Sequence, residues 1–293
     1  MQPHPPPPPQ SSINNATSMG TTTDGQILQE EPLQNGLTPS PLSSSLLHPL
    51  LLLSDSALPL GSFAFSSGLE SYLAHHPPSS THPTKFPHFL SLTVHSLATT
   101  TLPYLLACHR NPSLLPELDD TLDASTLCPV ARRASVAQGR ALLTLWERAL
   151  KREAVQDTGN QDAAQALNQF SLAMKKPATM SSTHDSSDLT HPACHLPLVW
   201  ALVTRALNLA LASSTYLYLF NHAKAVVSAA VRASVMGPYA AQGVLASGWL
   251  QREIEGAMER EWEVDVGDAA QGVPMWDVWV GRHELLYSRI FNS

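Results

Sequence analysis

The residues best suited to chemistry lie in one short stretch that holds three possible metal ligands. His191, Cys194 and His195 supply two imidazoles and one thiol, and donors of this kind suit Ni²⁺ or Zn²⁺. The opposing interpretation is a polar loop in which these residues occur incidentally. We favour the loop, because a closed zinc site normally has four ligands and no glycine shapes a turn here. The sequence therefore predicts no resident metal and no tightly bound cofactor, with these three residues as the candidates to test.

The chain lacks the short motifs by which several enzyme classes are recognised. It has no Gly-Lys-Ser/Thr step of a phosphate-binding loop and no Gly-x-Ser-x-Gly elbow, and His283-Glu284 is not followed by the second His of a metal helix. Asp55 and Glu70 have no evident partner acid for paired-carboxylate catalysis. We expect a protein that is not an enzyme. The opposing hypothesis is a catalyst that uses Asp55, Glu70 and Arg232, and it requires turnover by the isolated chain.

Composition and charge indicate a folded protein that is not built to bind nucleic acid. Of 293 residues, 43% are hydrophobic, and 24 acidic residues exceed 17 Lys and Arg, for a net charge of -7. Binding to a phosphate backbone depends on clustered cations. No Lys or Arg precedes Lys85, which argues against a secretory signal or a mitochondrial transit peptide. Three cysteines form no even-numbered disulfide framework, so we expect a cytoplasmic location.

One apolar stretch, Leu196–Phe220, is long enough to raise the question of a membrane span. Arg205 and Asn208 lie near its middle, and a central Arg costs about 2.5–3.5 kcal/mol on insertion scales. We therefore interpret the stretch as two buried helices of a soluble bundle and expect no membrane association.

Hydrophobic periodicity predicts an all-α protein with a single helical-bundle domain over residues 47–293. Over Val130–Arg152, apolar residues recur at spacings of three and four residues, as on one face of a helix. The small residues of His222–Met236 are typical of a central helix. Residues 1–46 are rich in Pro, Ser and Thr and are predicted to be a disordered tail. Residues 157–196 are predicted to be a flexible insertion with a disordered internal loop. Within it, one further helix is indicated by apolar residues at helical spacing: Ala163, Leu167, Phe170 and Met174.

Four stretches carry a resemblance to a known family. Leu51–Glu70 runs from apolar residues into an Asp-Ser-x-x-Pro-x-Gly turn and a helix start, and Val136–Arg140 contains a Gln-Gly-Arg step. Ser228–Gln242 carries Ser-Ala-x-x-Arg followed by Gly-x-x-x-x-Gln, and Gly281–Ser293 ends in Tyr-Ser-Arg-Ile-Phe-Asn-Ser. Together they resemble the UreF family of urease accessory proteins, in its eukaryotic, fungal-like form.

The resemblance implies an all-helical, homodimeric protein without enzyme activity. It further implies three partners: UreD (also called UreH), the GTPase UreG, and the urease apoprotein. In this interpretation the chain is a co-chaperone that bridges UreD and UreG, so that GTP hydrolysis is coupled to nickel insertion and nickel is handled only in transit. The alternative is a helical metal-binding protein that uses His191, Cys194 and His195 directly.

The C-terminal residues are the leading candidates for partner binding. Arg and an aromatic exposed together are enriched at interfaces, so Arg289 and Phe291 are expected to be exposed. For Arg232, the sequence favours a buried guanidinium satisfied by a carboxylate or helix carbonyls. Of Phe63 and Phe65, one is expected to enter the core and the other to face a partner. The complete candidate set is Tyr287, Ser288, Arg289, Ile290, Phe291, Phe63, Phe65 and Arg232.

Overall fold

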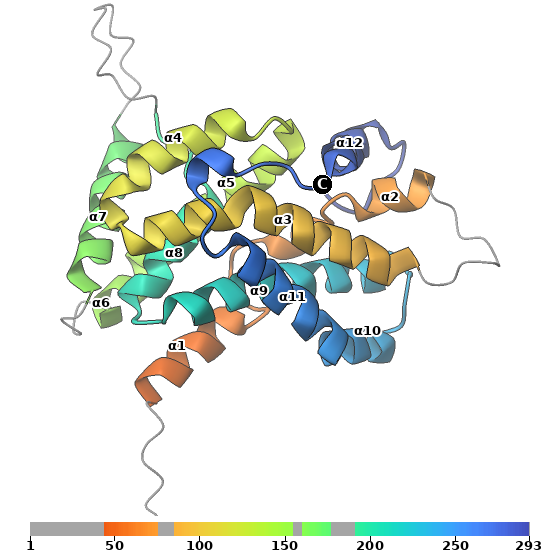
Figure 1. The fold of residues 1–293 in the computed structure, drawn as a ribbon, viewed down its shortest axis with the longest axis horizontal. Coiled ribbons are helices and arrows are strands. Elements are labelled where there is room, and N and C mark those ends of the chain that lie inside the picture. The colour runs from red at the N-terminus through yellow and green to blue at the C-terminus, as the bar shows by residue number, and fades with distance from the viewer. Residues whose placement is uncertain (1–43, 76–84, 155–159, 177–190, 293) are drawn as a thin grey trace, which may run out of the picture. The chain divides into compact units, whose positions relative to one another are not determined.

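Two helices, one of 26 residues and one of 11, form the centre of the molecule. Helix α3 (Lys85–Arg110) packs against α8 (Leu196–Ala206), α9 (Leu211–Arg232) and α11 (Gly248–Glu261), and Figure 1 shows α3 crossing the middle of the bundle. Nearly every residue of α8 is buried. A helix that is apolar on all sides needs neighbours on all sides, and α8 has them in α3, α5, α7 and α9.

The computed structural model confirms the predicted all-α class. Throughout the part of the chain that it describes, the regular elements are helices and no strand occurs. The described residues are 44–75, 85–154, 160–176 and 191–292. Most of the predicted disordered tail, residues 1–43, therefore lies outside them. The prediction was wrong for residues 44–46, which begin helix α1 (Ser44–Ser54). The described residues belong to one compact unit, Pro41–Ser293.

The remaining helices surround this centre. Their bounds are α1 Ser44–Ser54, α2 Leu69–His75, α4 Leu115–Ser125, α5 Pro129–Leu145, α6 Lys151–Ala154, α7 Gln161–Lys175, α10 Pro238–Leu245 and α12 Pro274–Arg282. Helices α5 and α6 are joined by a π-helical turn, Trp146–Leu150. The single helix predicted over Val130–Arg152 is therefore continuous, with a wider helical turn that begins at Trp146. The indole of Trp146 is fully buried there.

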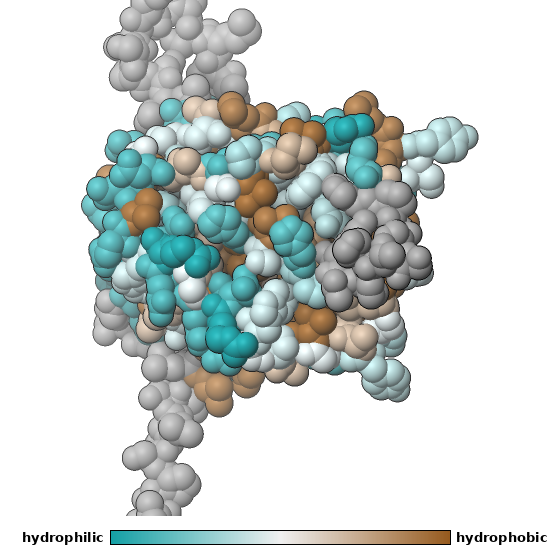
Figure 2. Space-filling model, turned by 45° about the vertical axis from the view of Figure 1, so that its right-hand side comes forward, coloured by the Kyte–Doolittle hydropathy of each residue, from teal (hydrophilic) through white to brown (hydrophobic). Residues whose placement is uncertain are grey.

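The apolar stretch Leu196–Phe220 is divided as expected, between α8 and the first half of α9. Among the described residues, no helix is long and apolar enough to cross a bilayer. On the face seen in Figure 2, hydrophobic residues form separate small patches among hydrophilic ones.

The predicted insertion 157–196 needs a correction. Its described part contains helix α7, which packs against α8 and α4 and buries Leu167 and Phe170. The helix predicted within the insertion is thus confirmed. The prediction that the whole span is flexible was wrong for residues 160–176 and 193–196. Residues 157–159 and 177–190 of that prediction lie outside the described residues.

Arg205 connects α7 to the core. Its guanidinium donates to the Asp162 carboxylate at the start of α7 (2.7 Å) and to the carbonyl of His109 at the end of α3 (2.6 Å). The Arg205 carbonyl in turn accepts a hydrogen bond from the side chain of Asn160 (2.9 Å). The residue that argued against a membrane span thus joins the ends of three helices.

Arg205→Met is expected to destabilise the protein by about 1–2 kcal/mol, because two charge-assisted hydrogen bonds are lost from a partly exposed ion pair. Urea unfolding followed by circular dichroism measures the change. The matched control is Arg260→Met on the exposed side of α11, which should change stability by no more than about 0.5 kcal/mol. Equal effects of the two substitutions would contradict the assignment.

Candidate functional site

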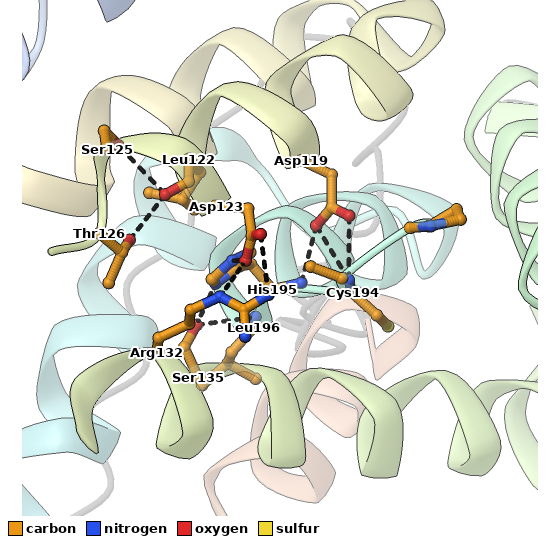
Figure 3. A network of polar contacts seen from close by, with 12 residues as sticks. Asp119, Leu122, Asp123, Ser125, Thr126, Arg132, Ser135, Cys194, His195 and Leu196 are labelled. Atoms are coloured by element: carbon orange, nitrogen blue, oxygen red, sulfur yellow. Dashed lines mark hydrogen bonds and ion pairs between the residues drawn. The ribbon is translucent and has the colours of Figure 1, made fainter. Parts of the chain in front are cut away.

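The three candidate metal ligands do not converge. Asp119, which is almost fully buried, accepts hydrogen bonds from the backbone N–H groups of Cys194 (2.9 Å) and His195 (2.8 Å), as Figure 3 shows. Cys194 adopts a left-handed φ of 74°, and burial raises the pKa of its thiol to about 12. A thiol that resists ionisation is a poor metal ligand.

His195 is held on both sides of its ring. Its Nε2 lies 3.0 Å from the Asp123 carboxylate and its Nδ1 3.0 Å from the Ser135 hydroxyl. Arg132 binds the same carboxylate through two nitrogens, and these hydrogen bonds lower the pKa of Asp123. The order Asp–His–Ser is that of a hydrolase triad, but the imidazole is 1% exposed.

The network therefore anchors the turn before α8. His191, by contrast, is exposed and turned to its neighbour's carbonyl. Among the described residues, no group of three His, Cys, Asp or Glu side chains could hold a metal ion. The described structure therefore does not bring together the three candidate ligands of the alternative function, direct metal binding.

Gly139 explains why this turn can lie against α5. A Cβ atom at position 139 would lie 2.0 Å from the Cys194 carbonyl oxygen and 2.8 Å from the His195 carbonyl carbon. Both are backbone atoms, so no side-chain rotation relieves the clash. The Gln-Gly-Arg step identified in the sequence thus marks a helix–backbone contact, which Arg140 extends by donating to the Ala193 carbonyl (3.3 Å).

The loop after α1 carries the most specific sequence motif and is organised as a series of turns. The Asp55 carboxylate accepts the backbone N–H of Ala57 (2.9 Å) and so closes the first of these turns. Gly61 has a φ of 73°, a left-handed conformation that favours glycine. Phe63 is 69% exposed and Phe65 is half-buried. Neither ring lies in the core, as had been expected of one of them, and Phe63 is the more exposed of the two.

A groove of about 730 Å³ lies beside this loop and brings several candidates together. Phe63, Phe65 and Arg232 all line it, with Val231 and Val280. Its lining also includes the pair of Thr93 and His222, whose Oγ1 and Nε2 atoms are 2.9 Å apart. Burial lowers the pKa of His222 to about 4, so this histidine is neutral at physiological pH.

The C-terminal segment corrects two predictions. Phe291, expected to be exposed, is 3% exposed, and Arg232, expected to be buried, is exposed. The guanidinium of Arg232 lies over the Phe291 ring, 4.4 Å from its centroid. The aromatic ring folds back and joins the hydrophobic core of its own domain, where Arg232 covers it. Arg232 needs no buried acid because its charged group stays at the surface.

The other C-terminal candidates remain at the surface. Tyr287, Ser288 and Arg289 are exposed, and Ile290 is 66% exposed. Leu285 (80%) lies near them in the chain. Exposed apolar residues with an adjacent Arg have the composition of an interface.

Sequence reasoning missed the residue that holds this segment. The Glu70 carboxylate, in the first turn of α2, accepts the backbone N–H groups of Ile290 (2.8 Å) and Phe291 (3.1 Å) and contacts Nε2 of the buried His283 (2.8 Å). In the sequence Glu70 was a carboxylate without a partner. No local pattern could have found its partners, because they lie more than two hundred positions further along the chain.

Comparison with known proteins gives one consistent result. The UreF family model matches residues 80–248. A protein of Schizosaccharomyces pombe described as an uncharacterized urease accessory protein UreF-like is 33% identical over 84% of this chain and 97% of its own length. Urease accessory protein 6 of Cryptococcus neoformans is 29% identical (86% and 98%), and urease accessory protein F of Arabidopsis thaliana is 28% identical (82% and 89%).

Proposed function

Since this chain belongs to the UreF family of urease accessory proteins and thus has a role in urease maturation, we propose that it is a bridging co-chaperone. It holds a UreD-like (UreH-like) protein and the nickel-carrying GTPase UreG together on the urease apoprotein, so that GTP hydrolysis coincides with nickel release. Nickel is the cargo of this complex and is not a resident cofactor of the chain. The bridge operates as a homodimer in the cytoplasm.

The observation that carries the proposal is the exposed C-terminal segment held on a well-packed helical core. Tyr287, Arg289 and Ile290 point to solvent while the neighbouring Phe291 is buried. A bridge must present its contact residues in a fixed geometry, and preorganised residues bind with a smaller loss of conformational freedom. We assign this segment to UreD.

A second surface supports the proposal of two partners. Phe63 is exposed at the mouth of the groove, next to a loop whose turns are fixed by Asp55 and Gly61. The groove is also lined by residues of α3, α5 and α9 and by the region around Gln242. We assign the groove and Phe63 to the second contact.

The proposal predicts that the chain acts on a GTPase without binding GTP. In a mixture of urease apoprotein, UreD, UreG, Ni²⁺ and GTP, urease activity should rise only when this chain is added. Labelled GTP titrated against the chain alone should show no saturable binding, because the sequence lacks a phosphate-binding loop; the assembled complex should bind it through UreG. Micromolar binding to the chain alone, or equal activation without the chain, would overturn the proposal.

A further inference from the structure

One buried carboxylate accounts for most of the polar contacts of the C-terminal segment. Both oxygens of Glu70 are used: Oε1 accepts the N–H of Ile290, and Oε2 accepts the N–H of Phe291 and lies within hydrogen-bond distance of His283. The Glu70 side chain is 12% exposed and the His283 side chain is fully buried. A carboxylate that accepts several N–H donors away from water forms strong, directional hydrogen bonds.

Two further contacts, which do not involve Glu70, also hold the C-terminal segment on the domain. The backbone N–H of Asn292 donates to the carbonyl of Ala64 (2.8 Å), in the turn that carries Phe63. The Phe291 ring is covered by Arg232. The segment is thus fixed by backbone atoms and by one buried ring, which leaves the side chains of Arg289 and Ile290 free to make other contacts.

We propose that Glu70 is the positioning residue of the partner-binding segment: its carboxylate fixes the backbone at Ile290 and Phe291, so that Tyr287, Arg289 and Ile290 face outward in the free protein. This inference rests on the proposed function, because it assigns to Glu70 the preorganisation of the surface that binds UreD. Glu70 itself does not touch the partner.

The chemistry makes Glu70→Gln the appropriate substitution. The carboxamide has nearly the same shape as the carboxylate, but one of its two acceptor oxygens becomes an NH₂ group. That group faces N–H donors and leaves at least one of them without an acceptor. The segment then detaches from α2, and its residues must be ordered again when the partner binds.

The test uses the full chain and a UreD homologue. Glu70→Gln should weaken UreD binding about tenfold or more, measured by titration calorimetry. In the free protein, amide hydrogen exchange of the peptide 286–293 should become faster, while exchange in α3 and α8 stays as in the wild type. A role of Glu70 in global stability would instead accelerate exchange throughout the core.

The matched control is Glu284→Gln. This substitution removes the same charge at the residue next to His283. Glu284 pairs with Arg133, and within the described part of the chain no N–H group of the C-terminal segment donates to it. It should bind UreD with nearly wild-type affinity. Equal losses for Glu70→Gln and Glu284→Gln would show that surface charge, and not the attachment of the segment, determines binding, and would refute the proposal.

Truncation after Tyr287 separates this inference from the proposed function. If the truncated chain still binds UreD, the assignment of the segment to that partner fails. If truncation abolishes binding but Glu70→Gln changes neither affinity nor exchange, only the inference about Glu70 fails.

Discussion

Gly139→Ala is expected to destabilise the protein by at least about 3 kcal/mol, and the variant should accumulate largely as insoluble protein. In most exposed helix positions the same substitution is favourable, because alanine has the higher helix propensity. At position 139 the added Cβ would lie 2.0 Å from the Cys194 carbonyl oxygen. Either α5 or the turn before α8 must move, and both are tied to the Asp119 and His195 network.

Gly243→Ala is the control for this prediction. Gly243 also lies in a helix, α10, but nothing lies within 4 Å of the position its Cβ would take. Thermal unfolding should show an unchanged or slightly higher Tm for Gly243→Ala and a much lower one for Gly139→Ala. A Gly139→Ala variant as stable as the wild type would mean that the close contact between α5 and Cys194 does not exist in solution.

Removal of Ser288–Ser293 is expected to abolish co-purification with UreD. The truncated chain loses the exposed Arg289 and Ile290 together with the backbone contacts to Glu70. It also loses the buried Phe291, and burying such a ring contributes about 2 kcal/mol. The protein should therefore remain helical but melt at a lower temperature, and far-ultraviolet circular dichroism with a pull-down measures both effects.

Ile290→Asp distinguishes lost contact from lost stability. Ile290 is 66% exposed, so the substitution should change stability by no more than about 0.5 kcal/mol. It places a charge in the apolar part of the proposed interface and should reduce UreD binding strongly. If Ile290→Asp and the truncated chain both co-purify with UreD at wild-type levels, another surface makes the contact.

Much of the fold follows from the sequence alone, because helix periodicity is a local property. The three-and-four spacing over Val130–Arg152 predicts a helix whichever neighbours it meets, and the charge of Arg205 divides an apolar stretch that would otherwise suggest a membrane span. The family motifs are equally local. The Gln-Gly-Arg step and the terminal Tyr-Ser-Arg-Ile-Phe are readable without knowing what they contact.

The tertiary structure decided which side of each motif faces the core. Phe291 was expected to be exposed and Arg232 to be buried, and the structure shows the reverse. The two side chains contact each other although they are far apart in the chain, and the burial of a single side chain depends on such distant contacts. Glu70 acquired its role in the same way, from N–H groups donated by the C-terminal segment. His195 was one of three candidate ligands in the sequence, and the structure makes it an anchor because Ser135 and Asp123 contact its two ring nitrogens. Residue type and spacing determine which helices form; the hydrogen-bond partners that determine function come from segments far apart in the chain, and only the packed structure brings them together.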